Sequence, residues 1–456
     1  MTYDEVVDYI LNIPKFAKDG SGRGKSGNDN LRYVMTLLDN PFTKIKAIHI
    51  AGTNGKGSTT THIKNILCEL GYRVGVFTSP HLIKINERIA VADKKTLLEN
   101  ISDKDFVNCF YVVDKAVKQA VKNGHAHLSF FEFIFAMAAV YFETQSLDFV
   151  IYETGLGGRL DATNIVMPCV TAITSIGLDH VMYLGDTIEK IAYEKAGIIK
   201  PGVPVIYNTG KEAADSVIEN QARLVDSKAI NVAKTDYIIN GLLDKNIDFS
   251  ICNSYYKYDH LVIGGTTAIY QVDNAATAIA VCNEMYYRDN NRYIPYEMIK
   301  NAMAKFFWSG RMEQIHENVV LDGAHNDNAM VRFTESVNKS YAKQKKYLLF
   351  AVAEDKDYKD MISTLVHEVV FDGIFVTKID SERGVSSKFV ADIFINTLQD
   401  KKNGNFCRNT KVVNYDNIDT AFKMGFETAV KNNGVLFCVG SLYLVGSIKA
   451  AVEKAF

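Results

Sequence analysis

The sequence lacks the long apolar stretch of a membrane protein or a secretory leader. No run of eighteen apolar residues occurs anywhere in its 456 residues. Its N-terminus, MTYDEVVDYI, carries acidic residues where a leader would have a basic region followed by an apolar one. We therefore expect a cytoplasmic protein that has no membrane partner.

An excess of either charge is also absent. Lysine and arginine total 51 against 53 aspartate and glutamate residues, so no large positive field exists that would attract nucleic acid or anionic lipid by charge alone. We expect no nucleic-acid partner, and any polyanion that the protein binds must be small.

Paired cysteines are missing as well. The seven cysteines are scattered without a CxxC pair, and their odd number leaves at least one unpaired. Internal repeats and low-complexity tracts are absent too. We expect reduced, mostly buried thiols at Cys68, Cys109, Cys169, Cys252, Cys282, Cys407 and Cys438.

What the sequence contains is an alternation of strand and helix patterns. Its length exceeds the size at which one hydrophobic core usually keeps growing, so we expect two domains, residues 1–307 and 308–456. In the first, an apolar run at 45–52, a glycine-rich turn, a helix with one apolar face and a strand at 73–79 form a βαβ unit. Such a unit favours a parallel sheet, and a second α/β series follows in the other domain.

Further elements are expected on either side of this unit. Active sites of open α/β sheets lie where strands end, so the polar loops after the strands are candidate sites. The expected elements are a helix from Tyr3 to Phe16, a mobile loop at 19–27, a helix from about Leu31, and strands at 148–153, 170–176, 319–321, 347–352, 374–377 and 435–439.

The segment GTNGKGST, residues 52–59, lies between a predicted strand and a predicted helix. In that setting backbone N–H groups and a helix N-terminus hold phosphate, and Lys56 would reach the β- and γ-phosphates. Its spacing is a variant of the usual G-x-x-x-x-G-K-[ST] loop, and the alternative is a glycine turn with an incidental lysine. The residues expected to contact ATP here are Asn54, Gly55, Lys56, Gly57 and Ser58.

This variant loop, followed by TSPHL at 78–82, resembles the signature of the folylpolyglutamate synthase/dihydrofolate synthase branch of the Mur ligase superfamily. The string ETGLGGRLDATN at 153–164 is specific to this branch. The resemblance implies an α/β fold in which a P-loop-type, mostly parallel ATP- and folate-binding domain precedes a smaller Rossmann-like glutamate-ligase domain. Other matching segments follow in the family's order over nearly the whole chain: SFFE at 129–132, LDH at 178–180, EKAGI at 194–198, Gln271 with Asn274, WSGR at 308–311, DGAHN at 322–326 and GSLY at 440–443.

Phosphoryl transfer needs a hard divalent cation, so oxygen ligands should lie near the phosphate loop. Ser79 and Glu153 end predicted strands, and His180 follows another, so the three can converge at one sheet edge. The resemblance implies that these residues, with Ser58, hold Mg²⁺. The alternative for His180 is a loop histidine that bonds a neighbouring carbonyl.

Lys195 lies on an apolar stripe of a predicted helix. Asp186-Thr187-Ile188-Glu189 resembles a capping box that starts this helix. Burial would lower the pKa of the amine and free it to add CO₂ as a carbamate, whereas a lysine that extends past the stripe into solvent is the alternative. The resemblance implies a carbamylated Lys195, an anion that suits a second Mg²⁺.

The resemblance also assigns substrate contacts. Asn274 matches the family residue that contacts adenine. The alternative is that Asn274 is a buried asparagine that caps a helix. The resemblance matches Arg311 to phosphate, Asp322 to the ribose region, and His325 and Ser441 to the incoming glutamate. It implies that the catalytic residues are Lys56, Lys195, Arg311 and His325, and that the pteroate pocket is formed by Ser129, Phe131, Glu132, Leu160, Asp161 and Ala162.

Several positions depart from the family pattern, and two aromatic residues have a second interpretation. Phe130 and Phe131 suit a core as well as a pocket. The departures are Gly27-Asn28-Asp29 in place of a Gly-Leu-Glu-like element, Ser309 and Asp327 in place of prolines, and Tyr270 in place of a histidine.

The resemblance implies an ATP-dependent ligase, and we expect the protein to be a monomer. ATP would phosphorylate a folate carboxylate to an acyl phosphate, the amine of L-glutamate would attack it, and phosphate would leave, with metal and Arg311 stabilising the charge. The acceptor would be dihydropteroate or a reduced folate. Two alternatives stay open: a Mur-type ligase that extends a UDP-linked peptide, against which a phosphate loop as early as residue 52 argues, and a regulatory module that hydrolyses ATP slowly.

Overall fold

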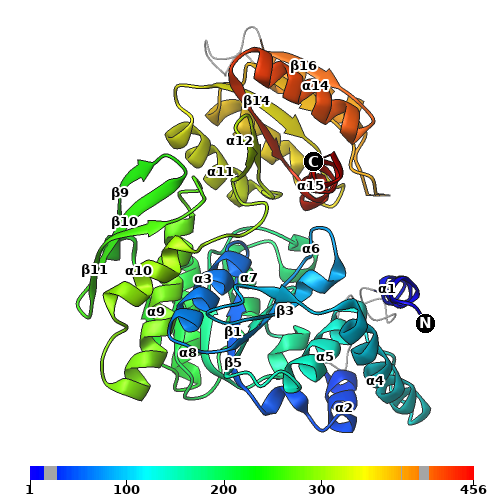
Figure 1. Cartoon of the computed structure of the whole chain (residues 1–456), viewed down its shortest axis with the longest axis vertical. Coiled ribbons are helices and arrows are strands. Elements are labelled where there is room, and N and C mark those ends of the chain that lie inside the picture. The colour runs from blue at the N-terminus through cyan, green and yellow to red at the C-terminus, as the bar shows by residue number, and fades with distance from the viewer. Residues whose placement is uncertain (15–27, 382, 400–409, 456) are drawn as a thin grey trace. The chain divides into compact units, whose positions relative to one another are not determined.

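The computed structural model describes residues 1–14, 28–381, 383–399 and 410–455. The expected loop at 19–27 and Cys407 lie outside these residues. The chain forms two compact units (Figure 1). Unit 1 comprises Met1–Ile238, Phe249–Leu261 and Asp273–Phe306, and unit 2 comprises Ile239–Asp248, Val262–Val272 and Phe307–Phe456.

Unit 1 is built on an eight-stranded sheet in the order β4-β3-β2-β5-β1-β6-β7-β8. From β2 to β8 all neighbouring strands are parallel, whereas β3 and β4 add an antiparallel edge. Inner parallel strands are covered on both faces, which is why their sequences are nearly continuous apolar runs. The strands are β1 (Lys46–Ala51), β2 (Val74–Phe77), β3 (Ile89–Ala92), β4 (Glu99–Asn100), β5 (Phe149–Glu153), β6 (Pro168–Ile173), β7 (Val205–Tyr207) and β8 (Ala229–Asn231).

The helices that the sequence predicts in unit 1 are present among others, and the expected βαβ unit is β1, α3 and β2. The helix expected from Tyr3 to Phe16 ends at Leu11, because Asn12 caps it and Pro14 disfavours a helical residue before it. The helices are α1 (Tyr3–Leu11), α2 (Asp29–Leu37), α3 (Lys56–Glu69), α4 (Asp103–Lys122), α5 (Phe130–Glu143), α6 (Val181–Leu184), α7 (Ile188–Ala196), α8 (Glu212–Leu224), α9 (Gln271–Asn290) and α10 (Tyr296–Ala304).

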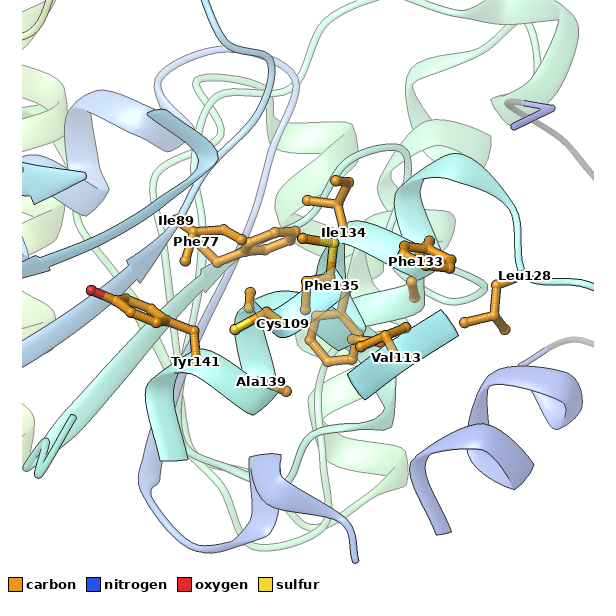
Figure 2. Close-up of a cluster of buried hydrophobic side chains, with 14 of the residues drawn as sticks. Phe77, Ile89, Cys109, Val113, Leu128, Phe133, Ile134, Phe135, Ala139 and Tyr141 are labelled. Atoms are coloured by element: carbon orange, nitrogen blue, oxygen red, sulfur yellow. The ribbon is translucent and has the colours of Figure 1, made fainter. Parts of the chain in front are cut away.

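A core of aromatic and aliphatic side chains fixes α4 and α5 against the sheet (Figure 2). Phe77 of β2 packs against Phe135 of α5 with ring centroids 5.9 Å apart, and Phe110 of α4 packs against Phe133 at 5.8 Å. All four side chains are buried. This packing sets the position of the N-terminus of α5, where part of the expected pteroate pocket lies.

Unit 2 contains a six-stranded sheet in the order β12-β13-β17-β14-β15-β16, parallel except for β12. The predicted α/β fold class is therefore confirmed, and all four strands expected beyond residue 308 are present. Its strands are β12 (Glu313–His316), β13 (Val319–Leu321), β14 (Lys345–Phe350), β15 (Gly373–Val376), β16 (Lys411–Asn414) and β17 (Gly434–Val439). Its helices are α11 (Asp327–Ser340), α12 (Tyr358–Glu368), α13 (Ser387–Gln399), α14 (Ile418–Lys431) and α15 (Leu442–Ala455).

A third, three-stranded sheet was not anticipated. It has the order β11-β10-β9, and its residues are divided between the two units. The strands are β9 (Tyr237–Leu243), β10 (Asn246–Cys252) and β11 (Lys257–Ile263).

The sequence predicts reduced, mostly buried thiols and no membrane-spanning segment. The six described cysteines are free, and four of them are buried: Cys68, Cys109, Cys282 and Cys438. None of the helices in the described ranges is both long enough and apolar enough to cross a membrane.

Candidate active site

The phosphate loop joins the end of β1 to the start of α3. Gly55 occupies the N-cap position of α3 with φ of +87°, a conformation that glycine adopts without steric cost. The loop is tied to the end of the neighbouring strand β6, because Thr53 N–H donates to Ser175 O (2.8 Å) and Thr174 Oγ1–H donates to Asn54 O (2.7 Å). A rigid glycine turn thus leads into a helix N-terminus, which is the geometry that binds phosphate.

Asn274 lies directly against this loop. It is 7% exposed, and a Cβ at Gly55 would collide with its Oδ1. The alternative in which Asn274 caps a helix is wrong, because α9 already begins at Gln271. Asn274 is therefore a residue of the first helical turn and not its cap, and the structure places its amide at the turn of the phosphate loop.

We predict that Gly55→Ala lowers kcat/KM for ATP by roughly 10²-fold, because the new methyl group displaces Asn274 and shifts the loop. Steady-state kinetics with varied ATP measure this effect. Gly71→Ala is the matched control: Gly71 follows α3 with φ of +92°, and a Cβ there meets nothing within 4 Å. It carries the same backbone strain without the collision, so only thermal stability should fall. Equal kinetic losses in both variants would contradict the prediction.

Two lysine amines converge on one carbonyl oxygen at the start of this loop. Lys56 Nζ donates to Gly52 O (3.1 Å), and Lys195 Nζ donates to the same oxygen (2.7 Å). Lys195 is 3% exposed, and burial lowers its pKa to about 7, assisted by the charge of Lys56 and opposed by Asp179 and Asp161. Lys195 thus does not extend into solvent. Two neighbouring ammonium groups repel each other, so an anion placed between them, or conversion of one amine to an anion, is favoured.

Helix α7 carries Lys195 to this position. Its N-cap is Thr187, whose Oγ1 accepts a hydrogen bond from Lys190 N–H (3.3 Å), so the expected cap at Asp186 is off by one residue. Asp186 instead forms an ion pair with Lys190 (2.8 Å) on the surface. The apolar stripe of α7 packs into the core beside β6 and β7, and Lys195 follows that stripe inward because of its position in the helical period.

Glu153 and Ser79 lie together where the neighbouring strands β5 and β2 end. Glu153 pairs in register with Ile50 of β1, and its Oε2 accepts a hydrogen bond from Ser79 N–H (3.3 Å). Across the described ranges, no three His, Cys, Asp or Glu side chains gather closely enough to hold a metal ion. The candidate donors are mainly oxygen atoms from a few residues, with Ser58 in the first turn of α3, which fits Mg²⁺ because that ion keeps several water and phosphate ligands.

His180 lies in the loop after β6, and the phosphate loop is bonded to that loop. Thr53 Oγ1–H donates to Gly177 O (3.1 Å). His180 has φ of +50°, and its Nε2 lies 3.9 Å from Asp179 Oδ1. Sequence reasoning missed Asp179, whose charge acts on the amine of Lys195. The motif LDH contained this residue, but only the histidine was considered.

The expected pteroate residues fall into two groups. Ser129 caps α5, and both its N–H and its Oγ–H donate to Glu132 Oε2 (2.7 Å each). The Glu132 carboxylate is therefore used in the cap that begins the helix. Phe131 packs against Phe77, with ring centroids 5.5 Å apart, and its ring lies against Gly155. Phe131 is therefore both a partner of the core and a neighbour of the loop after β5.

The second group lies on that loop. Leu160 is 36% exposed, whereas Asp161 and Ala162 are buried. Asn28 Nδ2–H donates to Asp161 O (2.8 Å), so the described part of the expected Gly27-Asn28-Asp29 element contacts this loop. Gly27 itself lies outside the described residues.

In unit 2, Asp322 organises the segment that carries Arg311. The carboxylate is 2% exposed and accepts hydrogen bonds from Tyr270 Oη (2.7 Å), Met312 N–H (2.9 Å) and Ala324 N–H (2.8 Å). Burial raises the pKa of Asp322, and the nearby guanidinium of Arg311 opposes this. In this structure the carboxylate that was matched to ribose holds its own loops together.

His325 and Ser441 follow the parallel neighbours β13 and β17. Gly440 N–H donates to Ala324 O (3.0 Å), which holds the two loops side by side. His325 Nδ1 lies 2.7 Å from Gly323 O and must carry the proton of that bond, since a carbonyl only accepts. The Arg311 guanidinium lies against the α-carbon of Gly323, so the structure brings these residues to one edge of the sheet of unit 2.

The chain matches two family models. Residues 50–282 match the Mur ligase middle domain, and residues 309–451 match the dihydrofolate synthetase C-terminal domain. It is 34% identical over 436 residues to a dihydrofolate synthase/folylpolyglutamate synthase of Bacillus subtilis, which covers 94% of this chain and 95% of that protein. The chain belongs to the folylpolyglutamate synthase/dihydrofolate synthase family. The resemblance inferred from the motifs is confirmed.

Solved structures of this family share the fold. The Thermotoga maritima folylpolyglutamate synthase is 28% identical, with a TM-score of 0.79 over 100% of this chain and 97% of that one. E. coli FolC in complex with ADP, without folate substrate, is 25% identical, with a TM-score of 0.81 over 100% of this chain and 98% of that one.

The three departures from the family pattern in unit 2 each gain a polar bond. Tyr270 bonds Asp322, Ser309 Oγ–H donates to Glu313 Oε2 (2.9 Å), and Asp327 Oδ1 accepts from Thr364 Oγ1–H (2.6 Å). These bonds restrain the same loops at which the family usually has prolines or a histidine.

Proposed function

We propose that this protein joins L-glutamate to folates in an ATP-dependent reaction, with both dihydropteroate and a reduced folate as acceptors. Its family consists of ATP-dependent ligases of this kind. The observation that carries the proposal is the pair of lysine amines on Gly52 O, beside the ends of β2 and β5, because it provides a positive site for transferring phosphoryl groups.

In this proposal, residues 1–307 bind ATP and folate. Lys56 and the first turn of α3 hold the β- and γ-phosphates, and Asn274 contacts the nucleotide. Ser58, Ser79, Glu153, His180 and a carbamylated Lys195 would hold two Mg²⁺ ions, which would neutralise charge on the phosphate groups. The folate carboxylate attacks the γ-phosphorus, so that an acyl phosphate forms and ADP leaves.

Residues 308–456 supply the second half of the reaction. His325 and Ser441 receive glutamate, and its neutral amine attacks the acyl carbon, so that phosphate leaves as the amide forms. Arg311, whose guanidinium lies against Gly323 and near the charge of Asp322, stabilises the negative charge that develops in both steps. Ser129, Phe131, Glu132, Leu160, Asp161 and Ala162 form the pteroate side of the site.

The test is ADP release by purified protein with ATP, Mg²⁺, glutamate and either tetrahydrofolate or dihydropteroate, each omitted in turn. We expect release only when all components are present, with products one glutamate heavier by mass spectrometry. Release that requires a UDP-linked peptide would support the Mur-type alternative. ADP release that does not depend on the presence of any acceptor would support the regulatory module.

We also propose a cytoplasmic monomer without a nucleic-acid or membrane partner. The free state of the six described cysteines and the balanced charge support this proposal. Sedimentation analysis that gives a dimer would contradict its monomeric part.

A further inference from the structure

His49 is a buried histidine for which the proposed reaction has no use. It lies in the middle of β1, is 0% exposed, and burial with the charge of Lys200 lowers its pKa to about 3, so the imidazole is neutral. Its Nε2 lies 2.8 Å from Thr163 Oγ1, on a segment 114 residues further along the chain.

The directions of the hydrogen bonds around Thr163 can be assigned from chemistry. Thr163 Oγ1 lies 2.6 Å from Asp161 Oδ1, and a carboxylate oxygen accepts, so the hydroxyl proton goes to Asp161. At His49 the hydroxyl must then accept, so Nε2 carries the proton of the imidazole. The three side chains form a one-way relay in which His49 donates to Thr163 and Thr163 donates to Asp161.

Asp161 connects the relay to the main chain of residues 154–164, which we call the folate loop. Its Oδ2 accepts hydrogen bonds from Gly155 N–H and Leu156 N–H (2.9 Å each), and its Oδ1 also accepts from Thr163 N–H (3.0 Å). Burial raises the pKa of Asp161, and the bonds from Thr163 and these two amides oppose this rise. Gly155 and Leu156 come one residue after the strand that ends in Glu153, so the carboxylate sets the path of the chain as it leaves the sheet.

The opposite side of the folate loop is fixed to α7. Arg159 N–H donates to Glu194 O (2.7 Å), and Asn164 Nδ2–H donates to Gly197 O (3.0 Å). Gly158 lies so close that a Cβ there would be 2.9 Å from Lys195 O. The loop is therefore held between the helix that carries Lys195 and the relay that begins at His49.

The wall that the loop presents to an acceptor depends on this placement. The ring of Phe131 lies against Gly155, where an added Cβ would be 2.7 Å from Cζ, so a shift of Gly155 moves the ring or opens a gap. The phosphate loop has separate restraints, namely the bonds from Thr174 and Ser175 to Asn54 O. Loss of the relay should thus affect acceptor binding and leave the nucleotide loop in place.

We propose that the relay His49–Thr163–Asp161 is a positioning device for the folate loop, in which His49 and Thr163 set the affinity for the pteroate-bearing acceptor without contacting substrate themselves. This inference rests on the proposed function for the identity of the acceptor. His49 and Thr163 act through Asp161 and the amides that it binds, so they are positioning residues.

Paired substitutions separate the hydrogen bonds from bulk and burial. Thr163→Val keeps the shape of the side chain and removes the hydroxyl, whereas Thr163→Ser keeps the hydroxyl. His49→Leu removes the donor, whereas His49→Gln retains an N–H close to the place of Nε2. We expect Thr163→Val and His49→Leu to raise the KM for the folate acceptor about tenfold, as expected for the loss of a buried bond to a charged group, with the KM for ATP unchanged. The serine and glutamine variants should recover most of the affinity.

Two kinetic outcomes would overturn the proposal. One is a parallel rise in the KM values for ATP and for the acceptor, which would indicate general damage to the fold. The other is a serine or glutamine variant that behaves like its apolar counterpart. If His49→Leu does not fold, the nearly isosteric Thr163→Val variant carries the test.

Hydrogen exchange of the backbone amides tests the relay without any assay of ligation. In Thr163→Val, exchange over residues 154–164 should become faster, while exchange over residues 52–59 should stay as in the unsubstituted protein. Unchanged protection of residues 154–164 would overturn the relay. A protein that adds glutamate to no folate, but shows the expected exchange, would instead overturn the proposed function alone.

Discussion

Replacement of Lys56 by alanine is expected to remove ATP-dependent ligation, with a fall in kcat/KM of roughly 10²- to 10³-fold or more. The amine lies at the start of α3, where it donates to Gly52 O and Thr53 O (3.2 Å), and in the proposed reaction it meets the terminal phosphates. Its removal takes away a positive charge that acts on the phosphoryl group as charge develops in the transition state. ADP release under saturating glutamate and acceptor measures the loss.

Lys64→Ala is the matched control for this substitution. Lys64 lies two turns further along the same helix, and burial lowers its pKa to about 8, while its amine donates to Leu97 O (2.9 Å). Its loss should lower thermal stability and leave the KM for ATP nearly unchanged. Unaltered kinetics in Lys56→Ala, or an equal kinetic loss in the control, would show that the phosphate loop has been misinterpreted.

The second large effect is expected for Lys195→Ala, which should lose most of the ligase activity and regain part of it when formate or acetate is added. The reason is the proposed carbamate: a small carboxylate can enter the space of the missing side chain and supply the oxygen ligands. The loss should be of the same order as for Lys56, roughly 10²-fold or more in kcat, because in the proposed reaction both residues act on the phosphoryl group. Turnover with and without added carboxylate measures both parts.

The carbamate also has a direct signature. Because the pKa of Lys195 is lowered to about 7, the neutral amine that adds CO₂ predominates above that pH, and addition releases a proton. A ¹³C carbamate signal from labelled CO₂ should therefore grow as the pH rises through 7, and it should be absent in Lys195→Ala. Lys200→Ala serves as the control, since Lys200 is a partly buried lysine one turn beyond α7 whose pKa is lowered to about 8. Rescue of that variant by acetate, or near-normal turnover of Lys195→Ala, would eliminate the carbamate.

Local patterns in the sequence were sufficient where the physical cause is itself local. The phosphate loop could be predicted because glycines, a lysine and a helix start occur within eight residues of a strand. The position of Lys195 on the apolar stripe of α7 could be predicted from the 3.6-residue period, whereas its burial was decided only by the fold. The exact ends of the helices could not be predicted from the sequence. Thr187 and not Asp186 caps α7, and α9 begins at Gln271. Neighbouring residues compete for these end positions with small differences in free energy.

Other features had no signal in the sequence. His49 lies in an apolar strand and has the pattern of a core residue, and nothing local indicates that Thr163 accepts its proton. Asp179 stood beside a candidate ligand but was not considered, because its effect on Lys195 requires the loop after β6 to lie against α7. The three-stranded sheet β11-β10-β9 was missed because its strands are only half buried and do not show a continuous apolar run.

The order of residues along the chain therefore established the α/β class, the phosphate loop, the family and the set of residue types at the site. Only the tertiary structure shows which atoms are in contact. The amines of Lys56 and Lys195 both donate to Gly52 O, Ser79 N–H donates to Glu153, and Asp161 accepts hydrogen bonds from main-chain amides of the folate loop. Motifs and periods depend on neighbours in sequence, whereas the contacts of Lys195 with Gly52 and of Ser79 with Glu153 join residues more than seventy positions apart and exist only once parallel strands are aligned in register.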